Sequence, residues 1–232
     1  MNFTFFNVTF DALYLGLGLT LLWFPRQWLR YGAFRRSARA ARSWAPNRDR
    51  EPGDLSVWLG EETAKMRNWV DFFRALAGGA AIGGTLIPTV AALTASRSDP
   101  QALRLLFGLK VGIFLVGLMV QTIRPEERVS LFAPIFYLQG LAFGLLGYKA
   151  ALLALSLAWV ANAVLPSAGV LLTVFGFLEI LAGVFFGQPK RECLVAGGLA
   201  LLPVLASVMF RRRLAQFTKR TKIIAGPSSS RG

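Results

Sequence analysis

Histidine is absent from this chain of 232 residues, and cysteine occurs only once, as Cys193. Without histidine, the chain alone cannot form a bis-histidine haem site, a His-liganded zinc or copper site, or a Ser-His-Asp triad. A single cysteine cannot form an internal disulfide. The sequence also lacks a P-loop, paired aspartates and a Gly-rich phosphate cradle, so ATP hydrolysis and phosphotransfer have no visible machinery. We therefore expect no metal and no cofactor, and the sequence argues against an enzyme.

Charged residues are also scarce, at 16% of the chain, whereas 54% of the residues are hydrophobic and the mean hydropathy is +0.50. A soluble domain of this length normally has about 25% charged residues. The charges cluster, which leaves stretches of about 18 or more apolar residues that could reach across the hydrocarbon of a bilayer. The composition therefore predicts an integral membrane protein.

Seven apolar stretches are predicted to form transmembrane helices. Membrane β-strands would be about 10 residues long with alternating polarity, and these stretches are longer and do not alternate. The region 129–187 is nearly unbroken, and we divide it at Gly147-Tyr148-Lys149 and at Pro166-Ser167, the only turn or interface signals in it. The predicted fold is an all-α, polytopic membrane helix bundle with spans at 5–24, 69–95, 103–123, 129–147, 149–165, 167–187 and 194–210.

The basic residues predict the orientation of these spans. The segment 26–67 carries ten Lys or Arg, the tail 211–232 carries seven, and 124–128 carries two, whereas the alternate loops carry few. Positively charged loops remain on the cytoplasmic side. Seven spans with the N-terminus outside and the C-terminus in the cytoplasm satisfy this rule, and we expect a bacterial-type inner (plasma) membrane.

The chain divides into four parts on this interpretation. No basic region precedes the first apolar stretch and no small-x-small cleavage site follows it, so we expect an uncleaved anchor. The parts are an N-terminal anchor helix at 1–25, a basic cytoplasmic or interfacial segment at 26–67, a six-helix membrane bundle at 68–210, and a basic cytoplasmic tail at 211–232 whose end is disordered.

The basic segment includes the stretch "RQWLRYGAFRRSARAARSWAP", whose arginines fall on one side at helical spacing and whose apolar residues fall on another. This pattern is typical of a basic helix in the headgroup plane that binds anionic lipids, or of a docking site for a protein partner at the cytoplasmic face. The alternative is that the charge only sets the topology. The candidate lipid-binding residues are Arg35, Arg36, Arg39 and Arg42. Nucleic acid is not an expected partner, because the net charge of +14 is spread over membrane-flanking segments.

Small residues recur at helix-packing spacing within the predicted spans. Pairs of glycines four residues apart let two backbones approach closely, and with several neighbouring spans they are expected to pack inside the chain. The alternative is contact with another chain. The pairs are Gly79 and Gly83, Gly108 and Gly112, Gly140 and Gly144, and Gly183 and Gly187.

Polar side chains within the spans are costly in hydrocarbon and are the first candidates for a functional site. At the helical rise, Lys110 lies about 9 Å, and Gln139 and Glu179 about 12 Å, from the outer ends of their spans. We therefore predict a binding site for a substrate or ion at this level, with Glu179 neutralising Lys110. The alternative is that Lys110 extends alone to the outer interface, in which case Glu179 would favour its uncharged form. Asn162 and the pair of Asp71 and Arg74 are expected to be helix-packing groups.

Two classes of function fit these residues. The first is a small transporter, channel or ion-coupled carrier that uses Lys110, Gln139 and Glu179. The second is a non-catalytic membrane subunit or scaffold that binds partners or anionic lipids through its basic loop and tail. A lipid-modifying enzyme ranks last, because no nucleophile or acid–base set is visible.

Overall fold

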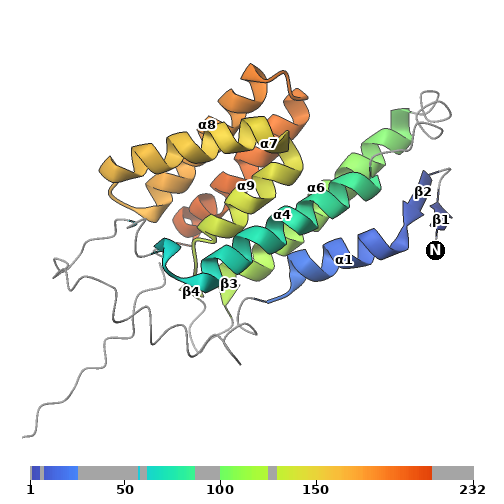
Figure 1. The fold of residues 1–232 in the computed structure, drawn as a ribbon, viewed down its shortest axis with the longest axis horizontal. Helices are drawn as coiled ribbons and strands as arrows, with labels where there is room; N and C mark the ends of the chain where they lie inside the picture. Colours follow the sequence, from blue (N-terminus) through green and yellow to red (C-terminus); the bar gives the residue numbers. More distant parts are fainter. Residues whose placement is uncertain are drawn as a thin grey trace, which may run out of the picture.

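The computed structural model of the chain describes residues 2–5, 8–25, 57, 62–86, 100–124 and 130–210 (Figure 1). These residues form a helical bundle, as predicted. α4 lies between α1 and α7, α6 runs beside α1, and α8 and α9 pack on each other and on α7. The elements are β1 (Asn2–Phe5), β2 (Val8–Asp11), α1 (Ala12–Trp23), α4 (Met66–Leu86), α6 (Pro100–Thr122), β3 (Ile123–Arg124), β4 (Ser130–Leu131), α7 (Ile135–Ala161), the 3₁₀ helix η2 (Asn162–Val164), α8 (Ala168–Phe185) and α9 (Lys190–Met209).

Four helical stretches are long and apolar enough to cross a membrane: Arg104–Thr122, Ile135–Val164, Ala168–Phe185 and Lys190–Met209. The inside of the bundle is apolar, with fully enclosed side chains such as Phe114, Leu141 and Phe175. Large apolar side chains are also exposed on the outside of these helices, including Leu105, Leu152, Leu181 and Leu205. A soluble protein rarely exposes so much apolar surface, whereas lipid tails can cover it. These features support the prediction of an integral membrane protein.

The N-terminal region differs from the predicted span at 5–24. Residues 2–5 and 8–11 pair as an antiparallel two-stranded sheet, in which Phe3 lies opposite Phe10 and Thr4 opposite Thr9. Thr, Phe and Val alternate here and favour strands, which explains why helix begins only at Ala12. The 12 residues of α1 extend about 18 Å, less than the hydrocarbon thickness of about 30 Å. The first half of that predicted span is therefore wrong.

The long helix α7 is a helical hairpin of two arms, 135–146 and 148–161. Gly147 between them has a φ of 71°, a left-handed conformation that favours glycine. The rings of Phe136 and Trp159 lie 5.7 Å apart, although a straight helix would separate these positions by about 35 Å. The predicted break at Gly147-Tyr148-Lys149 is thus confirmed.

The predicted break at Pro166-Ser167 is confirmed as well. The 3₁₀ helix η2 ends at Val164, and Leu165 has an extended conformation. Ser167 is the N-cap of α8, and its hydroxyl accepts a hydrogen bond of 3.3 Å from the backbone N–H of Val170. The cap satisfies one of the N–H groups that have no partner at the start of a helix.

Glycines hold α4 and the first arm of α7 close together. A Cβ added to Gly144 would lie 2.7 Å from the Cα of Gly79, and one added to Gly140 would meet the carbonyl oxygen of Phe72. Packing inside the chain is therefore confirmed for these glycines. For Gly108 and Gly112 of α6, an added Cβ would meet no described atom within 4 Å, so packing inside the chain stays a prediction for this pair.

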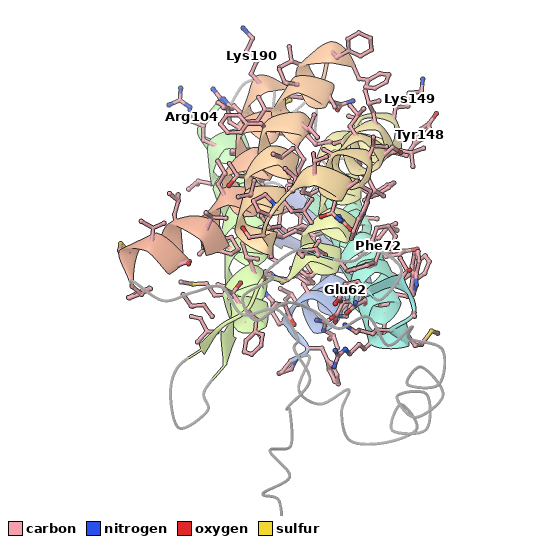
Figure 2. All side chains as sticks on the ribbon, turned by 90° about the vertical axis from the view of Figure 1, so that its left-hand side faces the viewer. Glu62, Phe72, Arg104, Tyr148, Lys149 and Lys190 are labelled. Atoms are coloured by element: carbon pink, nitrogen blue, oxygen red, sulfur yellow. The ribbon has the colours of Figure 1, made fainter. Side chains whose placement is uncertain are left out.

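Three basic residues that the predicted topology places on the outer side lie at one end of the bundle. Figure 2 shows Arg104, Lys149 and Lys190 together at this end, and Glu62 toward the opposite end. Below, the end that carries Arg104, Lys149 and Lys190 is called the Lys190 end. Residues 26–56 and 58–61 and the tail after Phe210 lie outside the described residues.

The hairpin in α7 predicts that positions 136 and 159 can be joined by a short bifunctional maleimide. In a Cys193→Ala background, Phe136→Cys with Trp159→Cys should give a crosslinked pair of tryptic peptides by mass spectrometry. The matched control combines Phe136→Cys with Val160→Cys in the same background, since Val160 is next to Trp159 but 75% exposed. Equal crosslinking of both pairs, or of neither, would contradict the hairpin.

Candidate functional site

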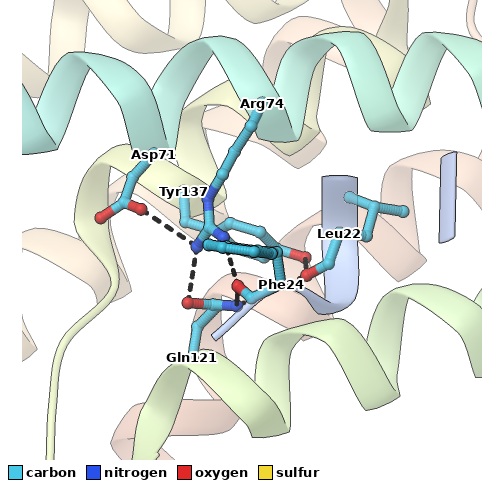
Figure 3. Close-up of polar contacts among 6 residues, drawn as sticks. All are labelled: Leu22, Phe24, Asp71, Arg74, Gln121 and Tyr137. Carbon is cyan, nitrogen blue, oxygen red and sulfur yellow. Dashed lines mark hydrogen bonds and ion pairs between the residues drawn. The ribbon is translucent and has the colours of Figure 1, made fainter. Parts of the chain in front are cut away.

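A buried polar network centres on Arg74 of α4 (Figure 3). The side chain of Arg74 is only 7% exposed, and its Nη2 lies 3.0 Å from Oδ1 of Asp71, one turn earlier. The same nitrogen donates a hydrogen bond of 2.6 Å to Oε1 of Gln121 on α6, and Nη1 donates to the carbonyl oxygen of Phe24. The predicted pairing of Asp71 with Arg74 is therefore confirmed, and the pair is part of a larger network.

The network satisfies the carbonyl groups at the end of α1. These groups have no partner within the helix, because the chain leaves the helix after Trp23 and Pro25 cannot continue it. Gln121 Nε2 donates to the carbonyl of Phe24 at 3.0 Å, and the Tyr137 hydroxyl donates to that of Leu22 at 3.2 Å. The guanidinium of Arg74 lies 5.6 Å from the centre of the Tyr137 ring. Side chains from α4, α6 and α7 thus cap α1 together.

Sequence reasoning did not identify Gln121 and Tyr137 as partners of Arg74. Gln121 is the next-to-last residue of α6, where a polar side chain is ordinary at a membrane interface. The available signal was Pro25, because a helix that ends inside a bundle needs donors for its last carbonyls. A buried arginine and glutamine on neighbouring helices can supply them.

Asn162, predicted to be a packing group, connects the bundle to the segment before α4. Its Nδ2 donates a hydrogen bond of 2.6 Å to the carbonyl oxygen of Val57, which is itself buried. Nearby on the chain, Glu62 pairs with Lys65 at 2.5 Å and accepts from Asn68 just inside α4. Asn162 therefore has the structural role that was expected for it.

Lys110 does not pair with Glu179. Its Nζ lies 3.6 Å from Oε1 of Glu192 in the first turn of α9, and the two side chains are 11% and 28% exposed. The lysine stem is long enough to bring its charge toward the Lys190 end of the bundle, where Glu192 follows the exposed Lys190 and Arg191 at the start of α9. The prediction that Glu179 neutralises Lys110 is therefore wrong, because helix depth alone does not tell which side chains face each other.

Glu179 is 2% exposed, and its Oε2 has no hydrogen-bond partner. The contacts of Gly183, which lies one turn further along α8, indicate which helices surround Glu179. A Cβ added to Gly183 would lie 2.5 Å from Cys193 Sγ of α9 and 3.3 Å from Leu146 Cδ2 of α7. Glu179 thus lies close to the place where three helices meet. Within the described part of the chain, no ion pair reaches its carboxyl group.

Gln139, on the first arm of α7, is 1% exposed, and its Nε2 also has no partner. It lies about 10 Å along this arm from Leu146, and Glu179 lies about 6 Å along α8 from Gly183. The first arm and α8 both run toward the Lys190 end, so Gln139 and Glu179 differ in level by about one helical turn. Of the three predicted residues, these two remain as a candidate site, and Lys110 does not join them.

The candidate lipid-binding residues Arg35, Arg36, Arg39 and Arg42 lie outside the described residues, as does the basic tail. Their role in binding anionic lipids or a partner stays a prediction.

The chain matches no protein-family model, no curated protein and no solved structure. Its function is therefore inferred from its own residues.

The network predicts that Arg74→Met costs about 3–5 kcal/mol of unfolding free energy, because it removes a buried cation that pairs with Asp71 and donates to the carbonyl group of Phe24. Denaturant unfolding in mild detergent measures the loss. Arg104→Met is the matched control, since Arg104 is exposed and a surface change of this kind is usually within about 0.5 kcal/mol. Equal stability of the two variants would contradict the network's role.

The pairing of Lys110 with Glu192 predicts a measurable coupling in a double-mutant cycle of Lys110→Met and Glu192→Gln. A partly exposed pair should couple by about 0.2–1 kcal/mol. The parallel cycle of Lys110→Met with Glu179→Gln should be additive within about 0.5 kcal/mol, because the two side chains do not touch. Stronger coupling in the second cycle than in the first would restore the prediction that Glu179 neutralises Lys110.

Proposed function

We propose that the protein is a small membrane carrier or channel for ions or small polar solutes, with Glu179 and Gln139 as its embedded site. The observation that supports this most directly is the carboxyl oxygen of Glu179, which is enclosed in the bundle without a partner. Buried polar groups are nearly always hydrogen-bonded, and an ionisable group inside a membrane bundle is costly to keep. A ligand or ion that binds there would compensate this cost.

We propose further that the chain crosses the membrane seven times, with an external N-terminus and a cytoplasmic C-terminus. Seven helical segments of at least 12 residues occur in the described residues: α1, α4, α6, the two arms of α7, α8 and α9. The gathering of Arg104, Lys149 and Lys190 at one end supports the alternation of sides. The heavily basic segments 26–67 and 211–232 would then face the cytoplasm of a bacterial-type inner membrane.

A second candidate function is a membrane subunit that assembles with another chain. One observation favours it, since Gly108 and Gly112 of α6 are exposed and meet no described atom within 4 Å of an added Cβ. Such pairs allow close approach of another membrane helix. In this case the basic segments would bind an acidic partner or anionic lipids at the cytoplasmic face.

The carrier proposal predicts that Glu179→Gln slows flux in liposomes that contain the purified protein. Flux is followed with a trapped pH dye, a trapped Na⁺ dye, and light scattering during swelling in glycerol or urea. Whichever probe reports flux through the unchanged protein, Glu179→Gln should reduce its signal by about tenfold. This is the factor produced by a loss of about 1.4 kcal/mol in the affinity of the site.

Glu192→Gln is the matched control, because it makes the same chemical change in the first turn of α9, outside the proposed site. Its flux should stay close to that of the unchanged protein. If no probe reports flux above protein-free liposomes, or if both variants reduce it equally, the carrier proposal fails and the subunit proposal gains.

A further inference from the structure

The atoms left without partners at the candidate site limit what it can bind. Oε2 of Glu179 and Nε2 of Gln139 are enclosed atoms without a hydrogen-bond partner within the described residues. Ca²⁺ and Mg²⁺ need about six or more oxygen ligands, and K⁺ gives up its water shell only to a cage of oxygen atoms. One carboxyl group and one side-chain amide supply at most three oxygen atoms, which do not make such a cage.

Two cations on the helices of the described bundle already have acidic partners. Arg74 of α4 pairs with Asp71, and Lys110 of α6 pairs with Glu192 of α9. Neither cation contacts Glu179, so neither can hold it permanently as a carboxylate.

The buried titratable groups that remain on the described helices around Glu179 are Cys193 of α9 and Tyr137 of α7. Tyr148 and Lys149 of α7 and Lys190 and Arg191 of α9 are exposed. The thiol of Cys193 lies next to Gly183, one turn from Glu179, and is 3.7 Å from the carbonyl oxygen of Gln188. The Tyr137 hydroxyl donates to the carbonyl of Leu22. Both are neutral groups with other neighbours, which leaves the charge of Glu179 to be balanced by what it binds.

We infer that the ion taken up at Glu179 is the proton, an inference that rests on the proposed carrier or channel function. A proton needs only one acceptor atom, and it removes the buried charge when it binds. In the uptake step, hydronium gives a proton to Oε2, which forms an O–H bond and leaves water. In the release step, the O–H bond breaks and a water on the other side accepts the proton.

Gln139 acts as a positioning residue in this scheme. Its Nε2–H group can donate to a water that in turn donates to Oε2 of Glu179, across the difference of about one turn in their levels. Such a water would satisfy both unpartnered atoms, and it would favour the carboxylate when the proton has left.

Infrared spectroscopy of the full-length protein in liposomes tests the inference, combined with flux assays under separate gradients of H⁺, Na⁺ and K⁺. We expect a carbonyl band of a protonated carboxyl group that shifts in D₂O, disappears in Glu179→Gln and persists in the control Glu192→Gln. Proton flux should be lost with the band, and Na⁺ and K⁺ should neither be carried nor move the band. Gln139→Leu should shift the band without removing it.

The outcomes separate the inference from the function on which it rests. If Na⁺ or K⁺ flux depends on Glu179 and the acid band is absent, the carrier stands and the proton is the wrong ion. If the band follows Glu179 but no ion crosses the membrane, proton binding stands and transport fails. If Glu179→Gln does not fold, Glu179→Asp is used instead, because it keeps the carboxyl group and should shift the band. A band that does not move would belong to another residue and would overturn the inference.

Discussion

The arrangement of the bundle depends on how the carbonyl groups at the end of α1 are satisfied. In a bilayer, every backbone polar group must find a partner inside the protein, because the hydrocarbon offers none. α1 ends against other helices, and its last carbonyls accept hydrogen bonds from Arg74, Gln121 and Tyr137, which come from α4, α6 and α7. One set of contacts therefore fixes four helices relative to each other. Asp71 balances the charge that this network brings into the bundle.

The same requirement makes Glu179 and Gln139 stand out. Both are as deeply buried as the Arg74 network. Arg74 and Asp71 pair with each other, although Arg74 Nε has no hydrogen bond. Within the described residues, no ion pair reaches Glu179, and neither Glu179 Oε2 nor Gln139 Nε2 has a partner. Polar groups that hold a fold together are expected to be satisfied within the fold, whereas groups that bind something else are left free by the fold itself. This contrast supports assigning structure to the Arg74 network and function to Glu179. Lys110, which had looked like part of the site, belongs with the matched charges through Glu192.

The sequence was most informative where local chemistry decides the structure. Composition predicted an apolar helical bundle, and Gly147 and Ser167 marked two real breaks because one takes a left-handed φ and the other caps a helix. Helix depth grouped Gln139, Glu179 and Lys110 at one level, and a site formed by Gln139 and Glu179 stays a prediction. Helix depth could not say which face of α6 carries Lys110 or that α9 would supply Glu192. The paired strands at 2–5 and 8–11 were not predicted, because their Phe and Val residues also fit an apolar span. Such pairings are set by tertiary packing, which one sequence does not display.

The stability of Glu179→Met is the most direct test of whether Glu179 serves function or holds the fold together. If Glu179 is kept for function, an apolar side chain of similar size removes an unsatisfied buried polar group, and the replacement should be neutral or stabilising. Thermal unfolding in mild detergent should then give a midpoint equal to or above that of the unchanged protein. A drop like that from a broken buried ion pair, about 3–5 kcal/mol, would show that Glu179 holds the bundle together and would contradict the account.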